Sequence, residues 1–358
     1  MNNWSHKPAI LAAARTINGN GSLDEVEVAV ERLRSQGLRL LELSIDSLAA
    51  GWNTPVQAGH FRSGAAPVEA LDHAIRRLCE GTADAVLISG ADQLKSGYRT
   101  PEGSRRTLMN IYGDECTLPQ AYTLLAFESI RAWGITVAEF KRIARDLFEN
   151  YAATQQRQGI YRAPDEQWFS EITELFRGVD CANPSIDFSG KLLVGSAETA
   201  LRLHPCPEEL VRVLGTNVQT LSRDGLDAIP EISRYAHLKA AFDGACASSG
   251  TDFVDAFLNG KALLEVYTCF PVVPMAFLLA SGLAATSADI SNLLADHEIT
   301  VTGGMNLAGA PWNNPVLNAL IAMHEQLKTG PRCLGCVHGN GGLGYKQGVA
   351  ILGKAAPQ

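Results

Sequence analysis

The chain has 358 residues, of which 46% are hydrophobic and 19% are charged, and its net charge is −8. These values are ordinary for a soluble globular protein, and the length allows a sizeable core in one domain or in two closely fused ones. Because the balance is acidic and no lysine- or arginine-rich block occurs, nucleic acid and anionic membrane surfaces are poor partners. No run approaches ~18 uninterrupted apolar residues, so no membrane span is expected.

Eight cysteines are spread along the chain without dense regular spacing, which suits a reduced cytoplasm. The first seven residues lack the apolar core of a secretory signal peptide. We therefore expect a cytoplasmic protein. Cys333 and Cys336 form the only CxxC pair, and no second ligand pair accompanies it. We interpret them as two core cysteines and expect no metal site.

The first half of the chain alternates strand and helix patterns. Apolar spacing predicts a helix over residues 23–33, with Val26, Val30 and Leu33 on one face, and a second amphipathic helix over 68–78. Residues 95–185 are less readable and hold one clear helix pattern. The predicted order is a strand (9–16), a helix (23–33), a strand (38–45), a helix (68–78), a buried strand ending near 90, a helix (138–151), and a strand followed by a helix (189–203).

The second half repeats this alternation of strands and helices. We predict a strand (211–217), a helix (237–256), a strand (262–267), an apolar helix (316–327), a short strand (333–338) and a closing strand (347–352). The glycine-rich residues 339–342 predict a hairpin turn, because glycine and asparagine accept positive φ at little cost. Such glycines at strand ends also let a ligand approach the backbone. The expected fold class is α/β with two pseudo-repeated halves.

Three stretches of the chain carry motifs that belong together. A glycine pair, Gly303-Gly304, runs into Gly309-Ala310-Pro311, and a second glycine-rich rim reads Gly341-Gly342-Leu343-Gly344. The helix over 68–78 leads through Gly81-Thr82-Ala83-Asp84 into a buried strand. These motifs resemble those of the thiolase superfamily. The stretch Tyr267-Thr268-Cys269-Phe270-Pro271 is similar to the Tyr-Ser-Cys-Phe-Pro of divergent thiolase-like proteins, which are often labelled acetyl-CoA acetyltransferases.

The resemblance implies a layered αβαβα fold with an N-terminal half over residues 1–206 and a C-terminal half over 207–358. An insertion at about 95–185 corresponds to the part of thiolases that holds coenzyme A. Arg99, Arg105 and Arg106 are the arginines available there for phosphate groups. The resemblance also implies a homodimer, which we expect to pair through the strand and helix around residues 83–90.

The catalytic residues of thiolases are not matched. Thiolases need a cysteine thiolate at the start of a helix, an activating histidine and a base. By resemblance, the nucleophile position is Gly64 or Phe61, the position of the Gly-His-Pro histidine is Ala310, and that of the base cysteine is His338. We therefore expect no standard reaction through a covalent acyl-cysteine.

We expect instead a protein that handles an acyl-CoA thioester without that intermediate, by acyl transfer or by cleavage or formation of a carbon–carbon bond. Coenzyme A enters only as the thioester substrate, and no separate cofactor is expected. His338 and Tyr267 are the catalytic acid or base candidates. The expected substrate-binding residues follow the two glycine-rich rims: Gly304, Ala310, Asn313, Asn314, Asn340, Gly341 and Gly342.

Two other functions stay open at this point. One hypothesis is a non-catalytic thiolase-like subunit that stabilises an active partner. The other is an acyltransferase whose reactive cysteine has moved to Cys336 or Cys246. Sterol-carrier-type relatives cleave carbon–carbon bonds with tyrosines and an OB-fold partner, so an OB-fold or thiolase-like partner protein is expected beside acyl-CoA. The candidate residues also have plainer roles: His338 as a core histidine, Tyr267 as a strand aromatic, and Asn313 as part of a helix cap.

Overall fold

The computed structural model describes residues 4–98, 105–204, 206 and 209–354. Two successive sets of strands and helices build its core. The first set is β1 (Ala9–Ile17), β2 (Asn20–Ser22), α1 (Asp24–Ser35), β3 (Leu40–Ile45), β4 (His60–Phe61), α2 (Ala66–Cys79), β5 (Ala85–Gln93) and β6 (Asp187–Gly195). The second set is β7 (Arg212–Thr220), α8 (Ala236–Ser249), β8 (Ala262–Glu265), α13 (Pro315–Thr329), β9 (Leu334–Gly341) and β10 (Lys346–Gly353).

The two sets share one topology. Across the described residues the strands form a ten-stranded sheet in the order β4-β3-β5-β6-β1-β7-β10-β9-β8, with β2 paired to β1. Within the first half β3 and β5 are parallel, while β6 is antiparallel to β5 and to β1. Within the second half β8 and β9 are parallel, while β10 is antiparallel to β9 and to β7. This repetition confirms the predicted pseudo-repeated halves.

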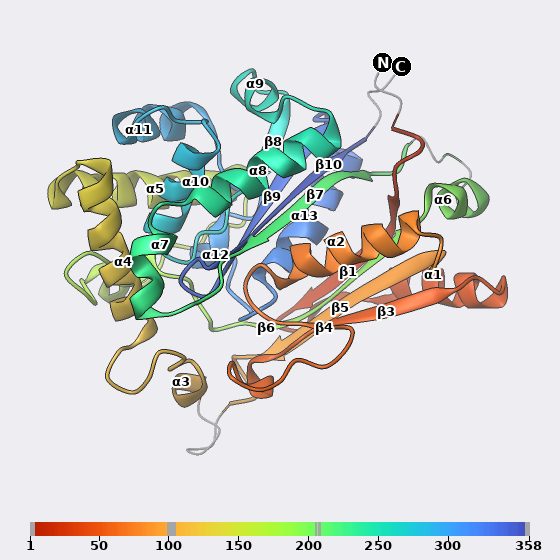
Figure 1. Ribbon diagram of the computed structural model, residues 1–358, viewed down its shortest axis with the longest axis horizontal. Helices are drawn as coiled ribbons and strands as arrows, with labels where there is room; N and C mark the ends of the chain where they lie inside the picture. Colours follow the sequence, from red (N-terminus) through yellow and green to blue (C-terminus); the bar gives the residue numbers. More distant parts are fainter. Residues whose placement is uncertain (1–3, 99–104, 205, 207–208, 355–358) are drawn as a thin grey trace.

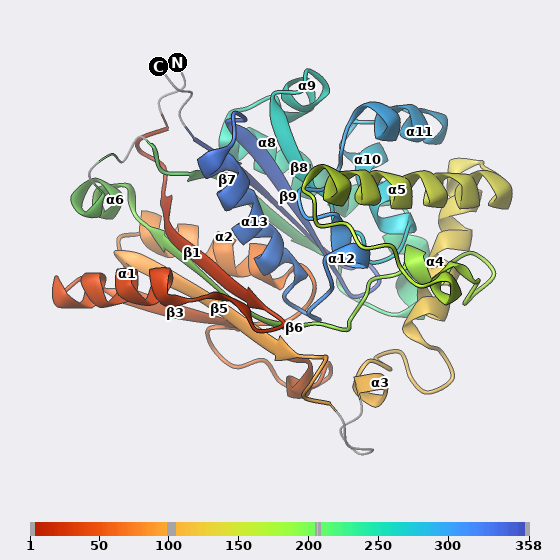
Figure 2. The same cartoon turned by 180° about the vertical axis from the view of Figure 1, so that it is seen from behind.

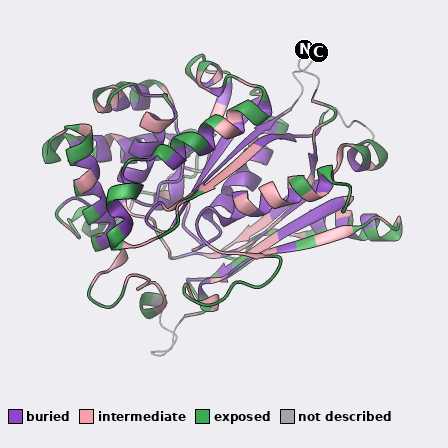
Figure 3. Ribbon diagram, viewed as in Figure 1, coloured by how far each residue is buried: buried purple, intermediate pink, exposed green. Residues whose placement is uncertain are grey.

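The contacts between helices and strands define the layers. Helices α2 and α13 lie side by side between the two halves of the sheet and contact strands of both, as Figures 1 and 2 show. Helix α1 covers the outer face of the first half, and α8 covers that of the second. Because α13 packs between the two halves of the sheet, its side chains are buried almost all round, from Pro315 to His324, and the centre of the molecule is mostly buried (Figure 3). The predicted αβαβα order is confirmed (Figure 1).

The insertion between β5 and β6 forms helices α3 (Arg105–Leu108), α4 (Leu118–Trp133) and α5 (Val137–Arg157). Helices α4 and α5 lie at one end of the layers beside three helices of the second half (Figure 1): α10 (Val272–Ala280), α11 (Ser287–Asp296) and α12 (Gly304–Leu307). Helix α3 lies apart from these and contacts the short 3-10 helix at Leu48–Ala50. The sequence pattern predicted α5 but missed α4, whose start is marked by a capping box between Thr117 and Gln120. The remaining helices are α6 (Ala197–Leu203), α7 (Ile229–Ile232) and α9 (Phe253–Leu258).

Two expectations change at this level. The hairpin turn lies at residues 342–345, because Asn340 and Gly341 still pair with Gln347 and Lys346 in the β9–β10 ladder. Strand β5 is paired on both sides, so it offers no open edge for the dimer expected at residues 83–90; the free edges belong to β4 and β8. The boundary expected between residues 206 and 207 adjoins positions outside the described residues. In the described part of the chain, no helix is both long and apolar enough to cross a membrane.

Candidate active site

A cavity of about 1060 Å³ lies where the insertion meets the loops of the second half. Its lining contains Gly64 from the start of α2, Tyr122 from α4 and Tyr267 from the loop after β8. These three residues come from distant parts of the sequence. Other residues that line the cavity are Trp52, Lys95, Arg106, Phe148, Arg162, Trp168, Cys181, Cys269, Phe270, Asn306, Ala310, Trp312, Asn313, Asn340 and Gly342.

The start of α2 reaches this cavity through a strained turn. Ser63 is fully buried and has a φ of 135°, which residues with side chains rarely adopt. A Cβ built on the next residue, Gly64, would overlap both the hydroxyl of Tyr267 and the carbonyl oxygen of Asn340. Gly64, one of the two positions that the resemblance offered for the nucleophile, therefore has no room for a side chain, and the Tyr267 phenol takes that space. Phe61, the alternative position, lines a separate, smaller cavity.

A chain of hydrogen bonds fixes one part of the cavity lining, which we call the cavity floor: Tyr122, Tyr267, Cys269, Asn340 and Gly342. Gln347 donates from Nε2 to Asn340 Oδ1 (2.7 Å), and Asn340 donates from Nδ2 to the Tyr122 hydroxyl oxygen (3.0 Å). The Tyr122 hydroxyl donates to the carbonyl oxygen of Gly342 (2.5 Å). Residues of the insertion and of the β9–β10 hairpin are thereby tied together. Neither Tyr122 nor Gln347 was among the predicted site residues.

His338 lies behind this floor. It is 1% exposed, its Nε2 lies 2.8 Å from Gln347 Oε1, and its Nδ1 accepts from the backbone N–H of Tyr267 (3.4 Å). Its ring also stacks on Phe277. Burial lowers the pKa of His338 to about 4, so the ring is neutral at pH 7. The acid or base role expected for His338 does not fit this position, because both ring nitrogens are engaged and the side chain is not part of the cavity lining.

The phenols and thiols of the cavity are neutral. Burial raises the pKa of Tyr267 and of Tyr122 well above their usual range. Burial likewise raises the pKa of the Cys269 thiol to about 12 and that of Cys181 well above its usual range, where Asp180 adds to the effect. At neutral pH these groups are hydrogen-bond donors and not bases or thiolates.

The predicted substrate-binding residues divide into two groups. Ala310, Asn313, Asn340 and Gly342 line the cavity. The other three lie behind it, each packed on a residue of another segment: Gly304 against Thr268, Asn314 against Gly90, and Gly341 against Ser63. Both side-chain polar atoms of Asn314 are buried without a hydrogen-bond partner in the described part of the chain.

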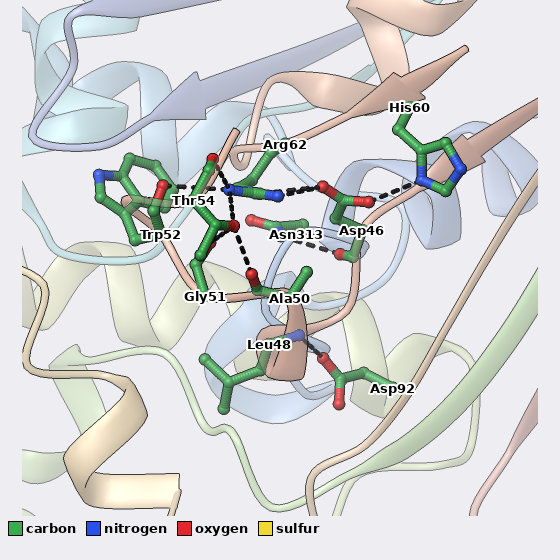
Figure 4. A network of polar contacts seen from close by, with 10 residues as sticks. All are labelled: Asp46, Leu48, Ala50, Gly51, Trp52, Thr54, His60, Arg62, Asp92 and Asn313. Carbon is green, nitrogen blue, oxygen red and sulfur yellow. Dashed lines mark hydrogen bonds and ion pairs between the residues drawn. The ribbon is translucent and has the colours of Figure 1, made fainter. Parts of the chain in front are cut away.

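A buried ion pair links the strained turn to the loop before α13 (Figure 4). The Asp46 carboxylate accepts from Arg62 at Nε (2.9 Å) and at the terminal nitrogen (2.7 Å), and it also contacts His60 Nδ1 (2.9 Å). Asn313 donates from Nδ2 to the backbone oxygen of Asp46 (2.8 Å). Arg62 further donates to the carbonyl oxygen of Trp52, a residue of the cavity wall (3.2 Å). This network fixes both segments that enter the cavity.

Three cationic side chains of the cavity lining are exposed to solvent: Lys95, Arg106 and Arg162. Of the arginines considered from the sequence, Arg106 is thus at the cavity, whereas Arg99 and the Arg105 side chain lie outside the described residues. Lys95 and Arg162 were not predicted. The lining also holds one exposed carboxylate, Asp165, so the four charged groups together are still cationic, which suits a phosphate-bearing ligand.

The cysteines proposed as relocated nucleophiles lie elsewhere. Cys336 is fully buried at the centre of β9, and Cys246 lies on the outer helix α8, where burial raises its pKa to about 11. Neither belongs to the cavity lining, whose cysteines are Cys181 and Cys269. If a thiol of this chain reacts with a ligand in the cavity, it is therefore Cys181 or Cys269. Among the described residues, no group of three or more histidine, cysteine, aspartate or glutamate side chains could hold a metal ion.

Solved structures of similar shape are thiolase-like. The chain superposes on a monomeric SCP2-thiolase like protein type 1 (STLP1) from Mycobacterium smegmatis with a TM-score of 0.70, at 18% identity over 99% of this chain and 78% of that one. An Ltp2-ChsH2(DUF35) aldolase gives a TM-score of 0.66 at 18% identity, over 98% of both chains. The Acat5 thiolase from Ascaris suum in complex with coenzyme A gives 0.63 at 15% identity, over 98% of this chain and all 100% of that one.

These similarities establish that the chain has a thiolase-like fold. No protein-family model matches the chain, and no curated protein matches it either. At identities of 15–18% the similarity shows the fold and not the reaction. The chemistry therefore has to be argued from the cavity itself.

Proposed function

We propose that the cavity binds an acyl-CoA thioester and promotes cleavage or formation of a carbon–carbon bond without a covalent acyl-cysteine. One observation carries this proposal: the Tyr267 phenol fills the space in front of Gly64, where the resemblance to thiolases places the nucleophilic thiol. A neutral hydrogen-bond donor thus stands where a covalent intermediate would otherwise form.

Tyr267 is the group that acts on the thioester in this proposal. Because its pKa is raised well above the usual range, its hydroxyl keeps its proton and can donate to the thioester oxygen as negative charge develops there. Donors held in place by a rigid, dry site stabilise such charge most effectively. His338 has a positioning role, since its Nδ1 holds the backbone N–H of Tyr267.

The rest of coenzyme A fits the outer part of the cavity. Lys95, Arg106 and Arg162 would meet its phosphate groups, and Asn306 offers a side-chain oxygen that has no hydrogen-bond partner among the described residues. Asn306 is 8% exposed and its amide nitrogen already donates to Val179 O (3.0 Å). An amide N–H of the pantetheine arm would satisfy that oxygen after a small side-chain rotation.

Two measurements test this function together. Calorimetric titration with coenzyme A should show binding to the full chain. Incubation with acetyl-CoA followed by intact-mass analysis should show no acetyl adduct. An adduct that disappears in Cys269→Ala or Cys181→Ala would replace the proposal with an acyl-enzyme reaction at that thiol, and no binding of coenzyme A would reject the proposal altogether.

A non-catalytic subunit is the second candidate, and one observation favours it. The titratable groups at the cavity floor, Tyr122, Tyr267 and Cys269, all have raised pKa values, so none of them is a base at neutral pH. A base would then come from the substrate or from a partner protein of OB-fold or thiolase-like type. In a complex with such a partner, unchanged turnover with Tyr267→Phe would favour the non-catalytic role.

The proposal includes a cytoplasmic homodimer. All eight cysteines are unpaired, which suits a reducing compartment. Strand β4 has a free edge at which a second copy could add a strand. Light scattering should give twice the chain mass; a monomer at every concentration would contradict the dimer and leave the proposed chemistry intact.

A further inference from the structure

Glu265 is an acidic side chain in the core of the second half. It ends β8, it is 5% exposed, and it lies shortly before Tyr267 in the sequence. A buried carboxylate is costly unless hydrogen bonds satisfy it. The Glu265 carboxylate accepts from the backbone N–H of Val301 (2.5 Å), from the backbone N–H of Thr302 (2.9 Å) and from the Thr302 hydroxyl (2.5 Å). One short, uncharged segment of the chain therefore supplies all three of these donors.

These bonds belong to a chain of contacts that reaches the cavity. Thr302 Oγ1 accepts in turn from the backbone N–H of Gly304 (3.1 Å). The next backbone N–H, that of Met305, donates to the Thr268 hydroxyl (2.8 Å), and Met305 lines the cavity. The segment is therefore fastened on both sides of Tyr267, by the acid that precedes it and by the threonine that follows it.

We infer that Glu265 is a positioning residue of the cavity: as a carboxylate, it holds residues 301–306 in the place that coenzyme A requires. This inference rests on the proposed function, in which Tyr267 meets the thioester and Asn306, at the end of the same segment, meets the pantetheine arm. Both contacts need a fixed spacing between the loop after β8 and this segment. The bonds at Glu265 set that spacing.

The protonation state of Glu265 changes near neutral pH. Burial raises the pKa of its carboxyl to about 7, whereas the hydrogen bonds from Thr302 and Val301 and the charge of Arg15 on β1 act in the opposite direction. Because those hydrogen bonds favour ionisation, they are stronger to the carboxylate than to the carboxylic acid. On protonation, one carboxyl oxygen becomes a donor to Thr302 Oγ1, and the Thr302 hydroxyl loses its acceptor. Tyr151 on α5, a further titratable group near Glu265, stays neutral because burial raises its pKa well above the usual range.

The test is a calorimetric titration of the full chain with coenzyme A at about pH 5.5 and pH 8.5, for the wild type and for Glu265→Gln. The amide resembles the protonated acid in shape and in its lack of charge. At the higher pH the variant should bind about fivefold less tightly, which is the difference between hydrogen bonds to a charged and to a neutral acceptor. At the lower pH the two proteins should agree within about twofold. A side chain with a purely structural role would give the same ratio of affinities at both pH values.

Glu298→Gln is the matched control. Glu298 lies just before the same segment, but its carboxylate accepts from Arg157 at the protein surface (2.8 Å) and does not line the cavity. The substitution removes the same charge and leaves the bonds of residues 301–306 in place. Its affinity for coenzyme A should stay within about twofold of the wild type at both pH values.

Hydrogen exchange followed by mass spectrometry tests the same contacts without a ligand. At the higher pH, a peptide that spans residues 299–307 should exchange faster in Glu265→Gln than in the wild type. Thr302→Val, which deletes the hydroxyl between Glu265 and Gly304, should have the same effect. Thr302→Ser keeps that hydroxyl and should exchange as the wild type does.

The outcomes separate the inference from the function on which it rests. If coenzyme A does not bind the wild type, the proposed function fails, and hydrogen exchange still decides whether Glu265 holds the segment. If coenzyme A binds but the ratio of affinities is the same at both pH values, or if Glu298→Gln shows the same loss, the inference is overturned and the proposed function stands. Wild-type exchange in both Glu265→Gln and Thr302→Val would also overturn it.

Discussion

Helices α2 and α13 occupy equivalent places in the two halves, yet their first turns meet the cavity differently. At α2 the chain arrives through strained Ser63 and presents Gly64, whose backbone packs against Tyr267 from the other half. At α13 it arrives through Trp312, with a φ of 49°, and presents Asn313, which is bound to Asp46. The start of α2 has no room for a side chain at Gly64, whereas the start of α13 carries the buried polar side chains of Asn313 and Asn314.

This difference bears on the proposed chemistry. In a symmetric scaffold, both helix starts could carry a reactive group near the cavity. In the proposed function the second half supplies the reactive hydroxyl of Tyr267 through the loop after β8, and the first half supplies the surface against which that hydroxyl packs. Strain is present on both sides, at Ser63 and Trp312, as is common near functional sites.

The largest expected effect comes from removing the hydroxyl that faces Gly64. Tyr267→Phe should lower turnover of the preferred acyl-CoA by about 10²–10⁴-fold, because a positioned proton donor contributes that much. The ring remains, so coenzyme A affinity should stay within about twofold. Steady-state kinetics and calorimetry on the same preparation measure both quantities. Tyr122→Phe is the comparison, because the Tyr122 hydroxyl is already bonded to Gly342 and Asn340 and is not the proposed donor to the thioester; an equal loss in both variants would contradict the special role of Tyr267.

Acid should destabilise the protein through the histidine that supports Tyr267. The pKa of His338 is about 4 in the folded protein and 6.5 in the unfolded reference, so the unfolded chain binds more protons between these values. Its contribution to stability is complete above pH 6.5 and falls as the pH drops, by about 2 kcal/mol between pH 6.5 and 5. Urea unfolding at these two pH values should show a smaller loss for His338→Gln than for the wild type.

His324 gives the matched comparison for that prediction. It is buried on α13, and its pKa is also lowered to about 4, but its Nδ1 has no hydrogen-bond partner among the described residues. His324→Gln should reduce the loss of unfolding free energy between pH 6.5 and 5 by a similar amount, without changing turnover. An unaltered pH dependence in both variants would show that neither histidine is buried in its neutral form.

A side chain at the start of α2 should cost stability. Gly64→Ala should lower the free energy of unfolding by about 1–3 kcal/mol, because the added Cβ overlaps Tyr267 and Asn340. Gly159→Ala is the comparison, since Gly159 has a φ of 72° but open space around its Cβ position. That change carries only the backbone cost of about 1 kcal/mol. Equal stability of Gly64→Ala and the wild type would mean that the Tyr267 ring moves aside readily.

The smallest expected effect concerns the other helix start. Asn313→Ala should destabilise the protein by about 1 kcal/mol through loss of its hydrogen bond to the Asp46 backbone oxygen. Leu201→Ala, at a site that is 59% exposed and outside the cavity lining, should have no more than a few tenths of a kcal/mol of effect. Denaturant titration compares the two variants. If Asn313→Ala lowers the free energy of unfolding by more than about 3 kcal/mol, the start of α13 tolerates substitution less well than Gly64 does, which contradicts the expected order.

The sequence was informative about the fold because hydrophobic periodicity and glycine placement are local signals. The longer strands and the two central helices followed from them, whereas the layer order was implied by the resemblance to thiolases. The cavity was less predictable, because it forms where the insertion meets loops of the other half. Tyr122 lies on a helix that the pattern missed, and the capping box at Thr117 was the available signal for it. His338 follows the expected motif in sequence, but its strand turns the ring toward Gln347 and away from the cavity.

The most direct test of the central claim is a crystal structure of the full chain with coenzyme A. The account predicts density for the ligand in the cavity of about 1060 Å³, with the phosphate groups at Lys95, Arg106 and Arg162. Its sulfur should contact the Tyr267 hydroxyl beside Gly64. Coenzyme A bound at another surface, or a sulfur joined to Cys181 or Cys269, would contradict it.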